Sequence, residues 1–407
     1  MIQRLTGIYN EEKTMRFTKA TWRNSLITGT IALGLLGAAT ANAADYAGTA
    51  YIAGMGGHFA KAVFKIDPKA ETPITLTEDL DKIDVGDGKT HPIHDARIDN
   101  KDRNTIYWST YKPDAAANNS YHYGKTDLKS GKVVVDKTFP IPAKVMSTKA
   151  GYCASAQTKD YFMPISMNKP GYLSVIDKKT MEMKHNIFFD GSEADVTGGV
   201  KYTHGINSPD MKEILITMNE SDSAPTNKEL GEGIGKLHLF VLDAKALEQG
   251  KIKVLRKGVA DGNVKKTISF RQYYSPDGKY IANATGDILF LIDAKTLKTV
   301  ASVTMAPLEE THDAIFTPDS KYVMITTRTK TVLPGCVDPT KPADGEWRMD
   351  GQVRLFDVAA KKLVGKPTSA CLKCHDEQIG TDDSAPHAVL CGLDVNWAKA
   401  AKAAKKK

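Results

Sequence analysis

The sequence predicts an all-β fold, a single β-propeller of six four-stranded blades, and two repeated features support it. The first is a strand, a tight turn and a second strand, with Pro-Asp in the turn of the clearest copies, at 204–217, 270–283 and 312–326. The second is an apolar strand that ends in Asp, found at 63–67, 173–177, 239–243, 289–293 and 353–357. Pro and Asp both favour turns, so each repeat is expected to be a group of short antiparallel strands.

A turn and a fourth strand complete the repeated unit, as at 251–255 and 299–303. Four short strands in each unit are typical of a propeller blade. First strands are predicted to begin at or near His94, Tyr152, His204, Arg271, His312 and His387. This gives six blades, with seven as the alternative because a diverged blade is easily missed.

The two ends of the chain are expected to share one blade. Segments 49–52 and 62–67 have the character of second and third strands without a first. Segment 387–394 has the character of a first strand without successors. Pairing the two ends closes the ring and leaves no open sheet edge.

The N-terminal region predicts export. Basic residues follow Met15, an apolar run occupies 26–39, and Ala41-Asn42-Ala43 forms an A-x-A cleavage site. We therefore expect an upstream extension and a signal peptide over 1–43, translation from Met15, a propeller over 44–396 and a periplasmic location. No later stretch approaches the roughly 18 apolar residues of a membrane span, so none is expected in the mature protein.

The run Cys371-Leu372-Lys373-Cys374-His375 is the C-x-x-C-H attachment signature of a c-type haem. The two thiols add to the haem vinyl groups and the imidazole ligates the iron. A disulfide, a zinc half-site or a redox pair is the alternative. Because haem attachment and export both belong outside the cytoplasm, we expect one covalent haem c, held by Cys371, Cys374 and His375 on a loop over 367–386.

Three further cysteines remain, Cys153, Cys336 and Cys391. An odd set allows at most one disulfide and one free thiol. Cys336 with Cys391 is the preferred pair, because both flank the haem segment.

Four histidines, His94, His204, His312 and His387, stand at or beside the predicted starts of first strands. First strands line the channel of a propeller, so these imidazoles are expected to meet at one mouth together with His375. Neutral imidazole is the commonest transition-metal ligand. One of them could be the second axial ligand of the haem iron, or several could hold copper. Alternatively, each could simply hydrogen-bond the backbone of a neighbouring blade. Met163, Met167 and Met305 are rival axial ligands.

The segment Y-T-H-G-I-N-S-P-D at 202–210, with F-V-L-D-A-K at 240–245, resembles YVTN-type propellers. That family includes the haem-binding propeller of cytochrome-type nitrite reductases, its biosynthetic relatives and the propeller subunits of periplasmic amine dehydrogenases. The resemblance implies the propeller fold. The nitrite reductases carry a separate haem-c domain, but only about 32 residues follow His375, too few for a domain. We therefore expect the haem on the propeller itself.

The formal charge of +7 includes the signal peptide and a Lys-rich tail over 397–407, so it indicates no nucleic-acid surface. The tail is either a solvated end or a docking segment for an acidic redox partner. No phosphate loop, nucleotide fingerprint or Ser-His-Asp spacing stands out.

The sequence favours a periplasmic monohaem c-type cytochrome, acting as an electron carrier or as an oxidoreductase with a His-lined site at the channel mouth. One alternative is a copper or zinc propeller without haem, its ligands drawn from Cys371, Cys374, His375, His387 and Cys391. Another is a non-catalytic propeller subunit that docks a dehydrogenase, as in the amine dehydrogenases, or a maturation factor.

Overall fold

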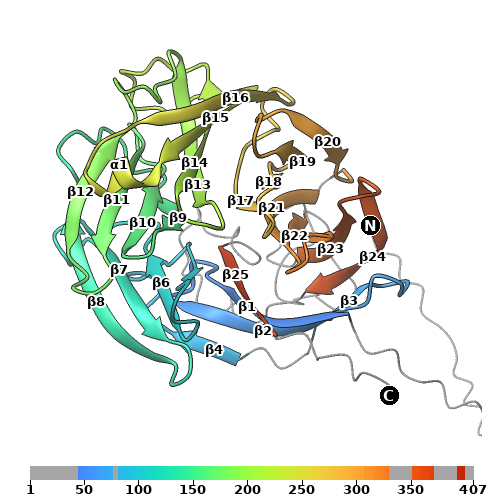
Figure 1. Cartoon of the computed structure of the whole chain (residues 1–407). Helices are drawn as coiled ribbons and strands as arrows, with labels where there is room; N and C mark the ends of the chain where they lie inside the picture. Colours follow the sequence, from blue (N-terminus) through green and yellow to red (C-terminus); the bar gives the residue numbers. More distant parts are fainter. Residues whose placement is uncertain (1–44, 77–80, 308, 330–350, 371–391, 399–407) are drawn as a thin grey trace, which may run out of the picture. The chain divides into compact units, whose positions relative to one another are not determined.

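The computed structural model describes residues 45–76, 81–307, 309–329, 351–370 and 392–398. These residues form six antiparallel sheets arranged as the blades of a β-propeller (Figure 1). The predicted all-β class and six blades are therefore confirmed. In the view of Figure 1 the first strand of each blade lies nearest the centre and the last strand lies at the rim.

The strands of the blades are as follows, from the inner strand outward. Blade 1 contains β25 (Leu393–Trp397), β1 (Tyr46–Ile52), β2 (His58–Ile66) and β3 (Ile74–Leu76), with β4 (Asp81–Asp84) also paired to β2. Blade 2 contains β5 (Arg97–Ile98), β6 (Thr105–Ser109), β7 (Ser120–Asp127) and β8 (Lys132–Pro140). Blade 3 contains β9 (Tyr152–Gln157), β10 (Tyr161–Ser166), β11 (Tyr172–Asp177) and β12 (Met183–Phe188).

The remaining three blades follow the same order. Blade 4 contains β13 (Gly199–Asn207), β14 (Glu213–Ser221), β15 (Gly233–Asp243) and β16 (Val254–Asp261). Blade 5 contains β17 (Gln272–Tyr274), β18 (Tyr280–Ala284), β19 (Ile288–Asp293) and β20 (Thr299–Thr304). Blade 6 contains β21 (Glu309–Phe316), β22 (Tyr322–Thr329), β23 (Gly351–Asp357) and β24 (Lys362–Ala370).

The ring closes between the two ends of the described chain, as predicted. β25 pairs antiparallel with β1, with Ile52 opposite Leu393 and Gly48 opposite Trp397. The closing strand was predicted over 387–394, whereas β25 begins at Leu393; residues 387–391 lie outside the described part. β25 extends through Trp397, whose ring packs edge-on against Phe64 at 5.2 Å, so this residue belongs to the propeller.

Two predicted strand starts differ from the structure. β5 begins at Arg97, because His94 lies in an irregular stretch after an isolated bridge between Ile93 and Thr110. β13 begins at Gly199, before His204, because its pairing with β14 continues across a register shift between Val200 and Thr203. Such irregularities arise where tertiary packing outweighs the repeat pattern.

The Asp residues that recur in the repeats stabilise the turns through hydrogen bonds. At the ends of third strands the carboxylate accepts a backbone N–H three residues later, in the pairs Asp177–Thr180 (2.8 Å), Asp293–Thr296 (2.7 Å) and Asp357–Ala360 (2.8 Å). In the Pro-Asp turns a hydroxyl donates to the carboxylate, in the pairs Ser208–Asp210 (2.7 Å), Ser275–Asp277 (2.7 Å) and Thr317–Asp319 (2.9 Å). The repeat is thus a repeat of Asx-type turns.

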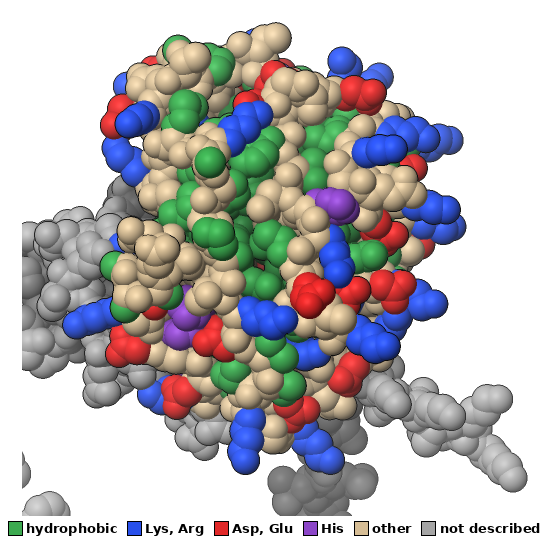
Figure 2. Space-filling model, turned by 90° about the vertical axis from the view of Figure 1, so that its left-hand side faces the viewer, with side chains coloured by type: hydrophobic (Ala, Val, Ile, Leu, Met, Phe, Trp, Pro, Cys, Tyr) green, Lys and Arg blue, Asp and Glu red, His purple; other side chains and the backbone are tan. Residues whose placement is uncertain are grey.

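Burial falls from the centre to the rim. Every residue of β9 is buried, whereas the rim strands β8 and β16 alternate between exposed and partly buried positions over most of their length. A half-exposed outer strand has this alternation because its side chains point to opposite faces. On the side of the molecule seen in Figure 2, Lys and Arg are interspersed with Asp and Glu, so this face is not dominated by one sign of charge.

Several predicted features lie outside the described residues. They are the signal peptide over 1–43, Cys371, Cys374, His375, His387, the proposed Cys336–Cys391 pair and the Lys-rich segment after Ala398. The helix of the described part is α1 (Ala244–Glu248), which begins after Asp243, whose side chain accepts the N–H of Ala246. Among the described residues, no helix has the length and apolar character needed to cross a membrane.

Candidate functional site

Three of the four predicted channel histidines lie in or just before inner strands and are buried. His94 precedes β5, His204 lies in β13 and His312 lies in β21, with exposed fractions of 7%, 0% and 1%. The rings of His94 and His312 meet with their centroids 5.7 Å apart. The structure therefore brings together His94 and His312, and His204 stands near them across the ring of Phe270.

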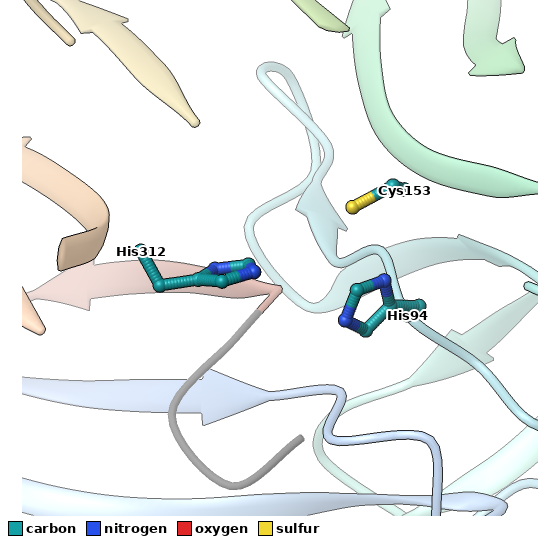
Figure 3. Close-up of side chains that lie close together, drawn as sticks. All are labelled: His94, Cys153 and His312. Atoms are coloured by element: carbon teal, nitrogen blue, oxygen red, sulfur yellow. The ribbon is translucent and has the colours of Figure 1, made fainter. Parts of the chain in front are cut away.

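A cysteine completes this group. Cys153, the second residue of β9, is a free and buried thiol. One ligand atom from each of His94, Cys153 and His312 lies within 4.8 Å of the other two. Figure 3 shows the two rings and the sulfur directed toward a shared space. We call these three residues the His-Cys-His triangle.

Sequence reasoning missed Cys153 as a site residue. It was considered only as a disulfide partner or a free thiol. The available signal was its position, one residue after the predicted start of a first strand at Tyr152, which is the same register that singled out the histidines.

An ion network lies beneath the triangle. The guanidinium of Arg271 is 2.9 Å from Asp95 and 3.5 Å from Asp313, and its exposed fraction is 2%. Arg271 also donates to the backbone carbonyl of His94 and lies 4.0 Å from the sulfur of Cys153. One buried cation thus connects residues from blades 2, 3, 5 and 6.

Asp313 holds the ring of His312. Its carboxylate is 3.0 Å from His312 Nδ1 and accepts the backbone N–H of Leu393, the first residue of β25, at 3.1 Å. With Nδ1 occupied in this way, Nε2 is the nitrogen of His312 that remains for a ligand. A carboxylate in this position fixes the tautomer and the orientation of a metal-binding imidazole.

Aromatic rings enclose the site. Phe270 stacks on His312 with centroids 4.7 Å apart, and the guanidinium of Arg328 lies 5.1 Å from the centre of the Phe270 ring. Tyr111 meets His94 edge-on at 5.0 Å. The histidines are therefore held in fixed orientations by their neighbours.

The environment keeps these imidazoles neutral. Burial lowers the pKa of His94 and of His204 well below the ordinary value, and nearby His312 and Arg271 lower both further. Burial also lowers the pKa of His312, although Asp313 opposes the shift. For Cys153, burial raises the pKa of the thiol to about 12. Neutral imidazoles beside a sulfur are a donor set suited to a transition metal.

His204 has a further peculiarity. Neither of its ring nitrogens has a hydrogen-bond partner among the described residues, although both are buried. Buried polar atoms without partners are rare in native proteins and call for an explanation such as a bound group. His204 therefore remains a candidate ligand, outside the His-Cys-His triangle.

The three methionines named as rival axial ligands have different surroundings. Met163 and Met305 belong to the apolar clusters between strands, and packing accounts for both. Met167 packs with Cys153 and Ala150 in a small cluster beside the triangle.

A second group of polar residues lies in blade 2. The ring centroids of His91 and His122 lie 4.1 Å apart. Both rings are hydrogen-bonded to Asp136, at 2.9 Å from His91 and 3.0 Å from His122. The other nitrogen of His122 bonds Asp114 at 3.2 Å, and the other nitrogen of His91 bonds Thr90 at 2.8 Å. Because all four ring nitrogens already have protein partners, this group is a hydrogen-bond network.

After the C-x-x-C-H motif, the described chain resumes at Gly392, beside the backbone of His94. Gly392 adopts a φ of +77°, and a Cβ there would meet the carbonyl oxygen of His94 at 2.6 Å. Its own carbonyl accepts the N–H of Ala53 at 3.2 Å. The first described residue beyond the predicted haem loop thus lies against the backbone of a predicted channel histidine.

No known protein family matches the chain, and no curated protein matches it. Among solved structures it is similar to a chain of hydrazine synthase from Kuenenia stuttgartiensis, with a TM-score of 0.44 and 16% identity. The similarity covers 69% of this chain and 66% of that chain, slightly less than two thirds of its length. Nothing about the site follows from so distant a similarity.

Proposed function

We propose that this protein is an exported monohaem c-type cytochrome built on a β-propeller, which transfers single electrons to or from a periplasmic partner. Two sequence features support the proposal, the C-x-x-C-H run and the export signal. The structural observation that supports it is the contact between Gly392 and the backbone of His94, because Gly392 is the first described residue after the C-x-x-C-H motif and His94 is a buried imidazole.

In this proposal Cys371 and Cys374 would hold the haem through thioether bonds, and His375 would ligate its iron. The haem would supply reversible one-electron chemistry. His204 would be the second iron ligand, because burial lowers its pKa and both its nitrogens lack hydrogen-bond partners in the described part of the chain. His94, His312 and His387 are the alternatives.

The resemblance to YVTN-type propellers, which include haem-binding ones, agrees with this function, and it leaves the substrate open. An active site at the His-lined mouth would make the protein an oxidoreductase instead of a carrier. The copper or zinc propeller without haem and the non-catalytic subunit remain the competing proposals.

Intact-mass measurement of protein made in a host with haem-attachment machinery tests the proposal. The expected result is a mature chain beginning at Ala44 with the mass of one added haem. A double variant, Cys371→Ala with Cys374→Ala, should lose that mass, and Cys153→Ser, the matched cysteine control, should keep it. An unmodified mass for the wild-type chain would remove the haem proposal.

The axial assignment has its own test. If His204 ligates the iron, His204→Ala should convert a low-spin ferric haem to high spin or shift its reduction potential. His185→Ala, which changes a histidine on the rim strand β12, should change neither.

A further inference from the structure

We propose that the His-Cys-His triangle, formed by His94, Cys153 and His312, is a mononuclear copper site. This site uses none of the residues of the C-x-x-C-H motif. Because it takes His94 and His312 as copper ligands, it leaves His204 and His387 for the iron of the proposed haem. It rests on the geometry, the donor set, the surrounding charge and the packing of described residues.

The geometry comes first. The three ligand atoms come from blades 2, 3 and 6, and each lies within 4.8 Å of the other two. Bonds of roughly 2.0–2.3 Å from a metal to imidazole nitrogen and thiolate sulfur place such ligands roughly 3.5–4 Å apart. Small side-chain rotations would therefore be enough to close the triangle around one ion, in the space that Figure 3 shows between the side chains.

The donor set selects the metal. Two imidazoles with one thiolate form the trigonal His₂Cys arrangement typical of copper electron-transfer sites. Asp313 is hydrogen-bonded to Nδ1 of His312 at 3.0 Å and so leaves Nε2 for the ion. Carboxylates commonly orient metal-binding histidines in this way. Arg271, which bonds the carbonyl of His94, fixes the backbone that carries the second imidazole.

The local charge also favours a cation. Asp95 and Asp313 together carry one more negative charge than Arg271, the cation that lies between them. All three side chains have exposed fractions of 2% or less. A thiolate on Cys153 would add a second negative charge. A buried thiolate is costly unless its charge is paired, and an ion bound by the triangle would pair it.

The packing around the sulfur is apolar. Cys153 lies in a cluster with Ala150 and Met167, against which Tyr111 and Tyr202 pack. Copper sites of this type combine a dry environment with a weak axial ligand, often a methionine thioether. Met167 is the methionine of the described chain that packs in this cluster.

The blade 2 network provides the contrast. There His91 and His122 also lie close to a carboxylate, but each ring nitrogen is hydrogen-bonded to a protein group. The triangle instead includes a sulfur, which the blade 2 group lacks. For these reasons the proposal concerns the triangle.

The test uses the purified full-length holoprotein, first treated with a chelator and then titrated with copper(II) sulfate. Metal analysis should find one tightly bound copper per chain. Electron paramagnetic resonance should show the narrow hyperfine splitting that a thiolate ligand gives to Cu(II), and this signal can be separated from that of a ferric haem. Bound copper should also raise the midpoint of thermal unfolding, because it binds the folded state.

Cys153→Ser should abolish the thiolate signature, and His312→Gln should weaken copper binding by about 100-fold or more. His238→Gln is the matched control, because His238 is a partly buried histidine bonded to Glu220 on the rim side of blade 4, and it should bind copper as the wild type does. Unfolding curves without copper show whether each variant folds. If Cys153→Ser does not fold, His94→Gln and His312→Gln decide the question.

Two results would overturn the proposal. One is a wild-type protein that takes up no more copper than a folded double variant, His94→Gln with His312→Gln. The other is an unchanged thiolate signature in a folded Cys153→Ser variant, which would assign the copper to another cysteine. Either result leaves the haem proposal untouched, because that one depends on the mass added at Cys371 and Cys374.

Discussion

Gly392 and His94 are in backbone contact at the point where the ring closes. The φ of Gly392 is +77°, and a Cβ at this position would lie 2.6 Å from the carbonyl oxygen of His94. That oxygen also accepts a hydrogen bond from Arg271. The entry of the closing strand is thereby connected to the predicted site.

The first prediction concerns this contact. Gly392→Ala should lower the free energy of unfolding by about 2–3 kcal/mol, because it combines a strained backbone with a steric clash. Gly278→Ala is the matched control, since Gly278 has a φ of +72° and open space around it. It should cost about 1 kcal/mol. Equal losses in urea unfolding would show that the contact with His94 contributes nothing.

The second prediction concerns closure of the ring. A chain that stops after Gly392 lacks β25 and leaves β1 as an unpaired edge, so it should aggregate and lose its cooperative unfolding transition. A chain that stops after Ala398 keeps all five pairs between β25 and β1, from Leu393 to Trp397. It should unfold as the full chain does. Size-exclusion chromatography and thermal unfolding compare the two, and equal behaviour would contradict the closure.

Most of this architecture was predictable from the sequence, because Asp residues end a strand in most of the repeats and Pro-Asp turns mark the clearest ones. The site was only partly predictable. His94, His204 and His312 were found from their register, but Cys153 and Arg271 were not, since neither residue type repeats at that register. The Arg271 pairs with Asp95 and Asp313 join residues far apart in sequence, and no local pattern encodes such contacts.

The third prediction concerns the buried cation. Arg271→Gln leaves Asp95 and Asp313 without their shared partner, so it should lower the free energy of unfolding by about 3–5 kcal/mol. Lys149→Gln removes an exposed pair with Glu229 and should cost no more than about 1 kcal/mol. Chemical denaturation measures both. A small effect of Arg271→Gln would mean that the carboxylates are paired in another way.

The fourth prediction concerns pH and the blade 2 network. The hydrogen bond that His122 donates to Asp136 raises the pKa of His122, and Asp114 raises it further. Bonds from His122 and His91 outweigh burial and lower the pKa of Asp136. The stability that His122 adds is fully present below its ordinary pKa of 6.5 and is lost as pH rises through its raised pKa. The stability that Asp136 adds is fully present above its ordinary pKa of 3.8 and is lost as pH falls through its lowered pKa.

The network should therefore stabilise the fold most between about pH 4 and pH 6.5. Replacing His122 by Gln should remove on the order of 1 kcal/mol in that window and less above it. His185→Gln, on β12, provides the comparison. Unfolding free energies measured from pH 4 to pH 9 should converge for wild type and His122→Gln at the alkaline end; a constant difference would mean that the charge of His122 has no part in stability.

The proposed function requires one redox-active haem c on the propeller of the exported protein. The reduced-minus-oxidised absorption spectrum of the purified holoprotein is the decisive measurement. We expect the bands of one c-type haem, with one electron taken up per haem when those bands are followed in a reductive titration. A flat difference spectrum, from protein made in a host that attaches haem to other C-x-x-C-H proteins, would contradict it.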